Sequence, residues 1–290
     1  IKSMQAVETL GSVDVIATDK TGTLTKNEMS ATELWVGDQH YDVTGNGYAP
    51  VGKIRLNDSQ ATLTDNLKLF LEAGYQANDT SLIEKDGKWH INGEPTDGAF
   101  LTLYRKALGV DYQSDFDPVD LLPFDSDYRY IAELTFNQAD NQQYIFVKGS
   151  PDKLFEMAQK ADPNFDLDKW TNRVNKWSDE GKRVIAVGYR KVPANESLAE
   201  VQHEHLYAGI TLLGIAALLD EPRPEVIAAL KTMNTAGVSV KMITGDDPKT
   251  ASAIGEQLGL APGKINAITG SQWDKLSADA QADAAEQNQV

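Results

Sequence analysis

The pattern of hydrophobic and polar positions differs between the two ends of the chain and its middle. An apolar run at 13–18 predicts a short strand that leads directly to Asp19. Towards the other end, the pattern predicts a buried strand at 210–219, a helix opened by Pro222 and Pro224, a second strand at 238–243, and a further helix that ends before Gly259. This alternation is typical of a parallel, doubly wound sheet, in which polar sites gather at the carboxyl ends of the strands.

The middle of the chain, residues 29–218, has the mixed pattern of an α+β domain with an antiparallel sheet. Strands are predicted at 31–36, 130–136, 143–147 and 183–189, and helices at 63–77, 97–108 and 168–180. The second and third of these strands are close enough to pair as a hairpin across 137–141. The chain is therefore predicted to consist of a first segment at 1–28, an insertion at 29–218 and a second segment at 219–290.

Composition narrows the class of protein. The 290 residues include 43 acidic and 27 basic side chains, which gives a formal net charge of −16. So acidic a surface repels a phosphate backbone, and we expect no nucleic acid among the partners. The absence of cysteine excludes disulfides, cysteine-based zinc sites and a cysteine nucleophile. His203 and His205 are close in sequence, but without further ligands at zinc spacing they indicate a solvated segment.

The apolar stretches and the two ends of the chain bear on membrane insertion, secretion and local order. The longest strongly apolar stretch, 210–219, is about half as long as a helix that spans a bilayer. No basic segment followed by an apolar run marks a signal peptide, so the chain taken alone is expected to be soluble. The last ten residues, 281–290, are polar, and we expect them to be frayed.

The candidate chemistry centres on the string Asp19-Lys20-Thr21-Gly22-Thr23-Leu24-Thr25. A carboxylate at a strand end can attack phosphorus in line and form an acyl phosphate. Because this attack brings two anions together, positive charge is needed nearby, normally Mg²⁺. Gly22 permits a tight turn, and backbone N–H groups and threonine hydroxyls can hold the transferred oxygens. A lone aspartate at a strand end, by contrast, is usually a cap or turn residue.

This string resembles the phosphorylation motif of P-type ATPases, which belong to the haloacid dehalogenase superfamily. A chance match at all seven positions has odds on the order of one in a million or less. The resemblance implies that Asp19 accepts the γ-phosphate of ATP, that Lys20 and Thr21 belong to the catalytic loop, and that Mg²⁺ is held by Asp19 and the main-chain carbonyl of Thr21. Phosphatases of the superfamily carry a second aspartate where this chain has Thr21, so the phosphoenzyme should persist longer here.

Two segments near the other end resemble further motifs of the family. Thr244-Gly245-Asp246 looks like the second phosphate-site motif, which implies that Thr244 binds phosphoryl oxygens and that Asp246 lies near Mg²⁺. Asp220-Glu221-Pro222-Arg223 looks like the hinge motif, with glutamate where proline is usual. It implies that Asp220 and Arg223 order the hinge and the ribose-phosphate end of the nucleotide. Asp19 and Thr244 meet only if their two strands belong to one sheet.

Segments of the insertion resemble the adenosine pocket of the family. Lys148-Gly149-Ser150-Pro151 looks like the motif whose lysine lines the pocket, and Pro123-Phe124-Asp125-Ser126 looks like the segment whose phenylalanine stacks on adenine. Ser126 stands where some members have arginine, and Arg129 can supply the basic group instead. A lysine at a strand end is often merely solvated, and a phenylalanine is often plain core, so both simpler readings stay open.

Three further matches complete the resemblance. Gly93-Glu94-Pro95-Thr96-Asp97 looks like another pocket motif, with Asp97 in place of the usual glutamate, although an acid here also suits a helix start. Arg183 matches a position that reaches the phosphates, and its forked donors suit phosphate oxygens. Val7-Glu8-Thr9-Leu10-Gly11 and Asn27-Glu28-Met29 fit the pattern on either side of the phosphorylation motif.

The resemblance covers nearly the whole chain and implies an α/β fold. An incomplete haloacid dehalogenase-like, doubly wound parallel sheet would form a phosphorylation domain from 1–28 and 219–290. An α+β, antiparallel-sheet nucleotide-binding domain would be inserted at 29–218. The whole would be the cytoplasmic part of an integral membrane pump that uses ATP and Mg²⁺, and its partners would be the transmembrane helices and the actuator domain of the same polypeptide.

The later Gly-Asp-Gly-x-Asn-Asp motif of the family is not in the sequence. We therefore expect a fragment that binds ATP at high micromolar to millimolar concentration, about −4 to −5.5 kcal/mol, with weak or no self-phosphorylation. One alternative is a soluble phosphatase of the same superfamily, which would steadily release phosphate from a small ester. Another is an ATP-sensing module without enzymatic activity, which replacement of Asp19 by asparagine would leave unaffected.

Overall fold

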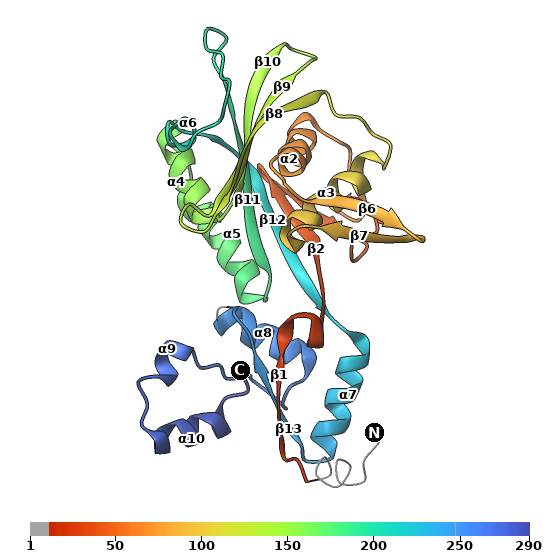
Figure 1. The fold of residues 1–290 in the computed structure, drawn as a ribbon, viewed down its shortest axis with the longest axis vertical. Coiled ribbons are helices and arrows are strands. Elements are labelled where there is room, and N and C mark those ends of the chain that lie inside the picture. The colour runs from red at the N-terminus through yellow and green to blue at the C-terminus, as the bar shows by residue number, and fades with distance from the viewer. Residues whose placement is uncertain (1–11, 247) are drawn as a thin grey trace. The chain divides into compact units, whose positions relative to one another are not determined.

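The computed structural model describes residues 12–246 and 248–290, and the chain forms two compact units (Figure 1). Unit 1 contains the described residues up to Asn27 together with Ser178–Lys182 and Asp220–Val290, and unit 2 contains Glu28–Trp177 and Arg183–Leu219. The chain changes unit within two long strands, β2 (Thr25–Val36) and β12 (Thr211–Pro222), and again at either end of the short stretch Ser178–Lys182. No helix of the described residues has both the length and the apolar character that crossing a membrane requires. The motif at 7–11 lies outside the described residues.

Unit 1 is built on two parallel strands, β1 (Val15–Asp19) and β13 (Ser239–Ile243). The remaining elements are the wide turn η1 (Lys20–Leu24) and the helices α7 (Pro224–Thr235), α8 (Pro248–Leu258), α9 (Gly270–Trp273) and α10 (Ala278–Gln287). Apolar side chains of β13, α7 and α8 form its core. The two predicted strands are confirmed, but two strands do not define a doubly wound sheet, so that part of the expected fold stays a prediction. Pro222 was expected to open a helix and instead ends β12.

The last residues of the chain differ from the expectation that they are frayed. α10 extends to Gln287, and the hydroxyl of Ser277 caps it by accepting a bond from Ala280 N at 3.3 Å. Met242 N then donates to the carbonyl of Gln289 at 2.8 Å, and Ile268 N donates to that of Val290 at 2.9 Å. The prediction was wrong because polar composition does not reveal the main-chain hydrogen bonds that a segment finds in the folded state.

Unit 2 is built around a nine-stranded sheet of order β5-β4-β3-β2-β12-β11-β10-β9-β8. Neighbours from β8 to β12 and from β2 to β5 run antiparallel. Its further strands are β3 (Gln39–Val43), β4 (Ile54–Leu56), β5 (Ser59–Gln60), β8 (Phe116–Asp125), β9 (Tyr130–Asn137), β10 (Gln142–Gly149) and β11 (Arg183–Lys191). The predicted antiparallel sheet and the hairpin of β9 and β10 are therefore confirmed.

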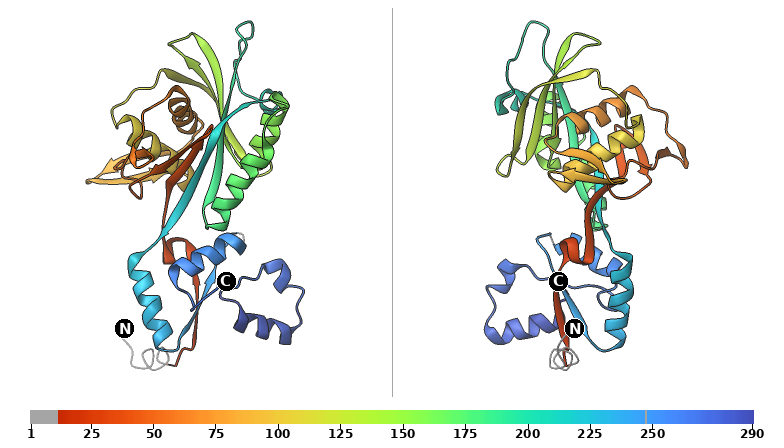
Figure 2. Two further views of the ribbon diagram at one scale, coloured as in Figure 1. Left: turned by 180° about the vertical axis from the view of Figure 1, so that it is seen from behind. Right: turned by 45° about the vertical axis from the view of Figure 1, so that its right-hand side comes forward.

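Helices cover both faces of this sheet (Figure 2). One face carries α2 (Asp65–Gln76) and α3 (Pro95–Leu108), and the other carries α4 (Pro151–Ala161), α5 (Leu167–Asp179) and α6 (His203–Tyr207). Because strand side chains alternate, Phe146 packs into the core beneath α2 and α3, while Ile145 and Val147 pack into the core beneath α4 and α5. Each face of the sheet thus has its own hydrophobic core.

A separate hairpin of β6 (Ser81–Lys85) and β7 (Lys88–Asn92) was missed by the sequence analysis. Its strands are mostly exposed, although apolar and polar residues alternate in β7, where Trp89 and Ile91 are half-buried. The available signal was the pair Asp86-Gly87, whose φ angles of 53° and 71° are those of a tight hairpin turn. Helix α4 and the short strands β3 to β5 were missed as well.

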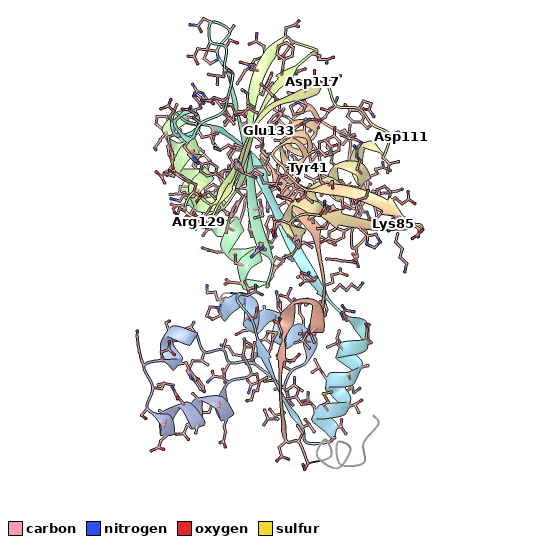
Figure 3. All side chains as sticks on the ribbon, in the orientation of Figure 1. Tyr41, Lys85, Asp111, Asp117, Arg129 and Glu133 are labelled. Atoms are coloured by element: carbon pink, nitrogen blue, oxygen red, sulfur yellow. The ribbon has the colours of Figure 1, made fainter. Side chains whose placement is uncertain are left out.

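Glu133 is a buried carboxyl group near the middle of β9 (Figure 3). It is 6% exposed, and its cross-strand neighbours are the apolar Phe146 and Leu121. Within the described part of the chain, no side chain pairs with it. Burial, and secondarily the charge of Asp120, raises the pKa of Glu133 from 4.5 to about 7. The folded chain therefore retains a proton here that the unfolded chain releases.

This pKa shift predicts that Glu133 destabilises the fold as pH rises from 4.5 to about 7, because ionisation is easier in the unfolded chain. We expect the Glu133→Gln variant to gain more stability over the wild type at pH 8 than at pH 4.5, by up to about 3 kcal/mol. Urea unfolding at both pH values measures the difference. Asp111→Asn, at an exposed site, is the control and should show no such pH dependence. An equal gain from Glu133→Gln at the two pH values would contradict the assignment.

Candidate functional site

The predicted phosphorylation residues in unit 1 lie at one edge of the parallel strand pair. Asp19, the last residue of β1, pairs in register with Ile243, the last residue of β13. Thr244 and Gly245 directly follow β13, so they begin at the same edge as Asp19. The condition stated above, that both strands share one sheet, is met. Asp19 and Thr21 are exposed, and both can be reached from solvent.

An ion pair between a buried lysine and a half-buried aspartate joins the loops that follow these two strands. Lys20 is 4% exposed, and its Nζ lies 2.6 Å from Oδ2 of Asp246. The main-chain N–H of Asp246 also donates to Oγ1 of Thr244 at 3.1 Å, which fixes the second loop. The lysine next to Asp19 in sequence is thereby held in place by a residue 226 positions away. The arrangement fixes the Lys20 ammonium in the loop that follows Asp19 and pairs its charge with the Asp246 carboxylate.

The loop Lys20–Leu24 is braced by Thr25, Asp220 and Arg223. The buried hydroxyl of Thr25 donates to Oδ2 of Asp220 at 2.6 Å, and Gly22 N donates to that hydroxyl at 3.3 Å. Arg223 donates from Nε to the carbonyl of Thr25 at 2.9 Å and from Nη2 to that of Gly22 at 3.0 Å. Gly22 has a φ of 75°, which glycine adopts without strain. Asp220 and Arg223 thus order the segment between β1 and β2.

One atom of this brace has no partner. Oδ1 of Asp220 is buried and forms no hydrogen bond with any described residue. A buried, unpaired carboxylate oxygen costs free energy, and such groups are rare in folded proteins. The contacts of Asp220 and Arg223 brace the loop Lys20–Leu24, whereas their expected roles at a hinge and at the ribose-phosphate end of a nucleotide stay predictions.

In unit 2, the predicted pocket residues Lys148 and Asp97 form a buried ion pair. Lys148 lies near the end of β10 and is 2% exposed, and its Nζ is 2.5 Å from Oδ1 of Asp97 in the first turn of α3. The same Nζ lies 3.5 Å from the carbonyl of Gly74 and 4.9 Å from the ring centroid of Phe100. The reading of Lys148 as a solvated strand-end lysine is therefore wrong.

The surroundings of Lys148 set its protonation. Burial lowers the pKa of Lys148, and the Asp97 carboxylate opposes that shift by favouring the charged ammonium. Asn78 holds the segment in place by donating to the main-chain carbonyl of Asp97 at 3.0 Å. Lys148 and Asp97 thus form a fixed, buried ion pair at the end of β10, next to the ring of Phe100.

Three more predicted residues lie at this end of the sheet. Arg183 begins β11, and its guanidinium donates to Oγ1 of Thr96, the residue before Asp97, at 3.3 Å. Gly149 allows close packing, because a Cβ there would lie 2.4 Å from the carbonyl oxygen of Arg129. Phe124, near the end of β8, is 59% exposed. A phenylalanine so exposed is not plain core, and its ring is free to stack on a ligand.

Ser126 and Arg129 are placed differently from the other pocket residues. Ser126 is exposed in the turn between β8 and β9. Arg129, labelled in Figure 3, has a φ of 62°. Its guanidinium pairs with the carboxylate of Asp152 in α4. The structure therefore does not bring Arg129 into contact with the Lys148–Asp97 pair. Sequence spacing could not show this, because the side-chain direction depends on the turn that precedes β9.

Two residues of the Lys148 site were missed by the sequence analysis. Gly74 supplies the carbonyl and Phe100 supplies the ring beside the ammonium. The signal for Gly74 was its place inside an apolar helical pattern, where glycine often marks close packing. A Cβ at Gly74 would lie 2.5 Å from Cδ1 of Phe100, so the small residue lets α2 and α3 approach. Phe100 itself gave no signal beyond ordinary helical periodicity.

Comparison with known proteins identifies the family. Residues 66–225 match the family described as "P-type ATPase, cytoplasmic domain N". This region contains Asp97, Phe124, Lys148, Asp220 and Arg223. The chain belongs to the P-type ATPases.

Curated relatives agree with this assignment over nearly the whole chain. The chain is 33% identical to a calcium-transporting ATPase of Bacillus subtilis, with 96% of this chain and 32% of the relative covered. It is 34% identical to the cation-transporting ATPase pma1 of Synechocystis, with 100% and 33% covered, and 32% identical to the human calcium-transporting ATPase type 2C member 2, with 98% and 30% covered. The chain thus spans about a third of the length of these P-type ATPases.

Because Lys148 and Asp97 form a buried ion pair in this P-type ATPase chain, we expect their effects on the free energy of unfolding to be strongly coupled. Lys148→Met leaves the Asp97 carboxylate buried without its partner, and we expect a loss of about 3–5 kcal/mol. The double variant Lys148→Met/Asp97→Asn should lose less than the sum of the two single variants, because neither charge is left alone. Urea unfolding measures all three. Lys88→Met, at an exposed position of β7, should change stability by less than about 0.5 kcal/mol. Additive losses would show that the pair is not coupled.

Proposed function

We propose that this chain is the ATP-binding and phosphate-accepting cytoplasmic part of a P-type ATPase that drives cation transport across a membrane. The observation that carries the proposal is the parallel register of β1 and β13, which sets Asp19 and Thr244 at one edge. The names of the relatives, calcium- and cation-transporting ATPases, support the substrate class. In the whole protein, the partners of this chain would be the transmembrane helices and the actuator domain.

In the proposed reaction, the Asp19 carboxylate attacks the γ-phosphorus of ATP and an acyl phosphate forms as ADP leaves. The Lys20–Asp246 pair would keep the attacking loop in place. Thr244 would hydrogen-bond the transferred oxygens. Since Arg223 and Thr25 already brace the loop, little reorganisation would accompany the step.

Mg²⁺ fits the donors at this edge, because the Asp19 carboxylate and the main-chain carbonyl of Thr21 are hard oxygen ligands. When bound, Mg²⁺ would neutralise charge on the phosphoryl group. Asp246 is the neighbouring carboxylate, and its ion pair with Lys20 sets how near it comes to a metal ion.

For the nucleotide, we propose that Phe124 stacks on adenine, that Lys148 and Asp97 line the adenosine pocket, and that Arg183 reaches the phosphates. The exposed ring of Phe124 and the buried, charged Lys148 support this division of roles. Gly149, Ser126 and Arg129 would shape the rim. A soluble phosphatase is not favoured, because Thr21 occupies the position of the second catalytic aspartate and the relatives are transport ATPases.

Nucleotide binding can be tested on the 290-residue chain by isothermal titration with ATP. Phe124→Ala should weaken binding about tenfold, which corresponds to about 1.4 kcal/mol, because the exposed ring loses its stacking contact. Ile83→Ala, at an exposed apolar position of β6, is the matched control and should bind as the wild type does. Asp19→Asn should also bind normally. Equal affinities of the Phe124→Ala and Ile83→Ala variants would refute the adenine site.

The phosphorylation step can be tested on the full-length protein that contains this chain. With ATP and Mg²⁺, the wild type should form a phosphoenzyme that hydroxylamine cleaves, as expected of an acyl phosphate. Asp19→Asn should abolish it, because an amide is not a nucleophile for phosphorus. Asp14→Asn, at an exposed position before β1, should leave it intact. Undiminished phosphorylation of the Asp19→Asn protein would show that another residue is the acceptor.

A further inference from the structure

Glu33, His40 and Asp42 form a group of potential metal ligands outside the sites described above. A ring nitrogen of His40 and one carboxylate oxygen of each acid all lie within 4.8 Å of one another. Among the described residues, 12–246 and 248–290, no other group of three histidine, aspartate or glutamate side chains meets this criterion. Their donor atoms are therefore close enough to share one ion.

The hairpin of β2 and β3 brings these side chains together. Glu33 pairs directly with Asp42 in the antiparallel register, and His40 is two residues before Asp42 on the same strand. Since strand side chains alternate, the three point to one face of the sheet, whereas Leu34 and Tyr41 pack into the core on the other face. The group is thus set by strand register and not by flexible loops.

The imidazole of His40 is held in a fixed orientation. Its Nε2 lies 2.8 Å from Oε1 of Glu33, and its ring centroid lies 5.0 Å from that of Trp35 and 6.3 Å from that of Trp177. Packing between two indole rings restricts the imidazole. A ligand that is oriented in advance loses less conformational entropy when it binds an ion.

The basic side chains nearby are engaged with other groups. Arg55 lies opposite Asp42 in β4, but its guanidinium donates to the carbonyl of Asp58 at 2.6 Å. Arg173 stacks on Trp35 at 3.8 Å and pairs with Asp38. Asp42 is exposed, and no described residue bonds to its carboxylate. One donor of the group is therefore available, and no described basic side chain neutralises it.

We propose that Glu33, His40 and Asp42 bind a divalent transition-metal ion, with Zn²⁺ as the reference ion. One imidazole nitrogen and two carboxylate oxygens are ligands that Zn²⁺ accepts, and three protein ligands leave a position for water. The imidazole disfavours Mg²⁺ and Ca²⁺, which prefer oxygen, and the chain has no cysteine to compete for the ion. The bound ion ties β2 to β3, independently of the proposed nucleotide site.

An ordinary ion pair between His40 and Glu33 is the competing explanation for their contact. A change at Asp42 distinguishes this explanation from a metal site. The pair needs only His40 and Glu33, whereas the metal site needs all three residues. Replacing the exposed Asp42 does not disturb the packing of His40 between the indole rings. Asp42→Asn is therefore the decisive variant, because we expect the chain to fold normally when this exposed residue is replaced.

The test is isothermal titration of the 290-residue chain with ZnCl₂ in a buffer that does not chelate. The wild type should show one saturable site, Asp42→Asn should bind at least tenfold more weakly, and His40→Gln should lose the site. His90→Ala removes an exposed histidine of β7 and should bind as the wild type does. Zn²⁺ should raise the melting temperature of the wild type and of His90→Ala, but not that of Asp42→Asn.

Co²⁺ binding gives a second, spectroscopic measurement, to which an ion pair between His40 and Glu33 alone would not contribute. The wild type should show visible ligand-field absorption on Co²⁺ binding and quenching of tryptophan fluorescence, since the His40 ring lies 5.0 Å from Trp35. In Asp42→Asn both signals should need at least tenfold more Co²⁺, and in His40→Gln they should be lost. No saturable Zn²⁺ binding by the wild type, or equal affinity of the wild type and Asp42→Asn, overturns the proposal.

Discussion

The parallel pairing of β1 and β13 is the constraint on which the rest of the structure depends. It joins residues that are more than two hundred positions apart, and the ion pair of Lys20 with Asp246 closes the same distance at the strand ends. Closing so long a loop costs conformational entropy, although that cost grows only slowly with loop length. The intervening residues can therefore form a unit with its own sheet and its own two cores. β2 carries the chain into this unit and β12 carries it out, and of the residues between them only Ser178–Lys182 belong to unit 1.

Both candidate sites rest on the same physical arrangement, a buried lysine paired with an aspartate from a distant element. Lys20 meets Asp246 in unit 1, and Lys148 meets Asp97 in unit 2. A buried ammonium is tolerable only with a partner, so each pair ties two segments together as well as supplying charge. Glu133 is the contrasting case, because it is buried without a partner and its pKa rises to about 7. Burial of the unpaired carboxyl group favours its protonated form, because no described cation is there to stabilise the carboxylate.

The hairpin of β2 and β3 shows how a strand register can assemble chemistry that no motif marks. Glu33, His40 and Asp42 follow none of the usual metal-binding spacings in the sequence. Antiparallel pairing sets Glu33 opposite Asp42, and two tryptophans from different elements enclose the imidazole. His203 and His205, two positions apart in the chain, are the histidines whose sequence spacing invited comparison with a zinc site, which the lack of further ligands argued against. Nδ1 of His203 contacts the hydroxyl of Tyr130, and Nδ1 of His205 accepts a bond from Gln202 N, so the two imidazoles have separate partners.

The sequence by itself determined the elements with strong periodicity, such as β9, β10, α2 and α3, and it marked Asp19, Thr244 and Lys148 through short motifs. Local patterns suffice there because backbone geometry and burial repeat with a fixed period. Only the tertiary structure decided that Asp19 and Thr244 share an edge, that Lys148 is buried against Asp97, and that Arg129 turns towards Asp152. It also decided that the polar last residues bond to β13 and to the loop at Asn266. Contacts between segments far apart in the chain leave no periodic trace, since they depend on the direction in which each side chain emerges from the folded backbone.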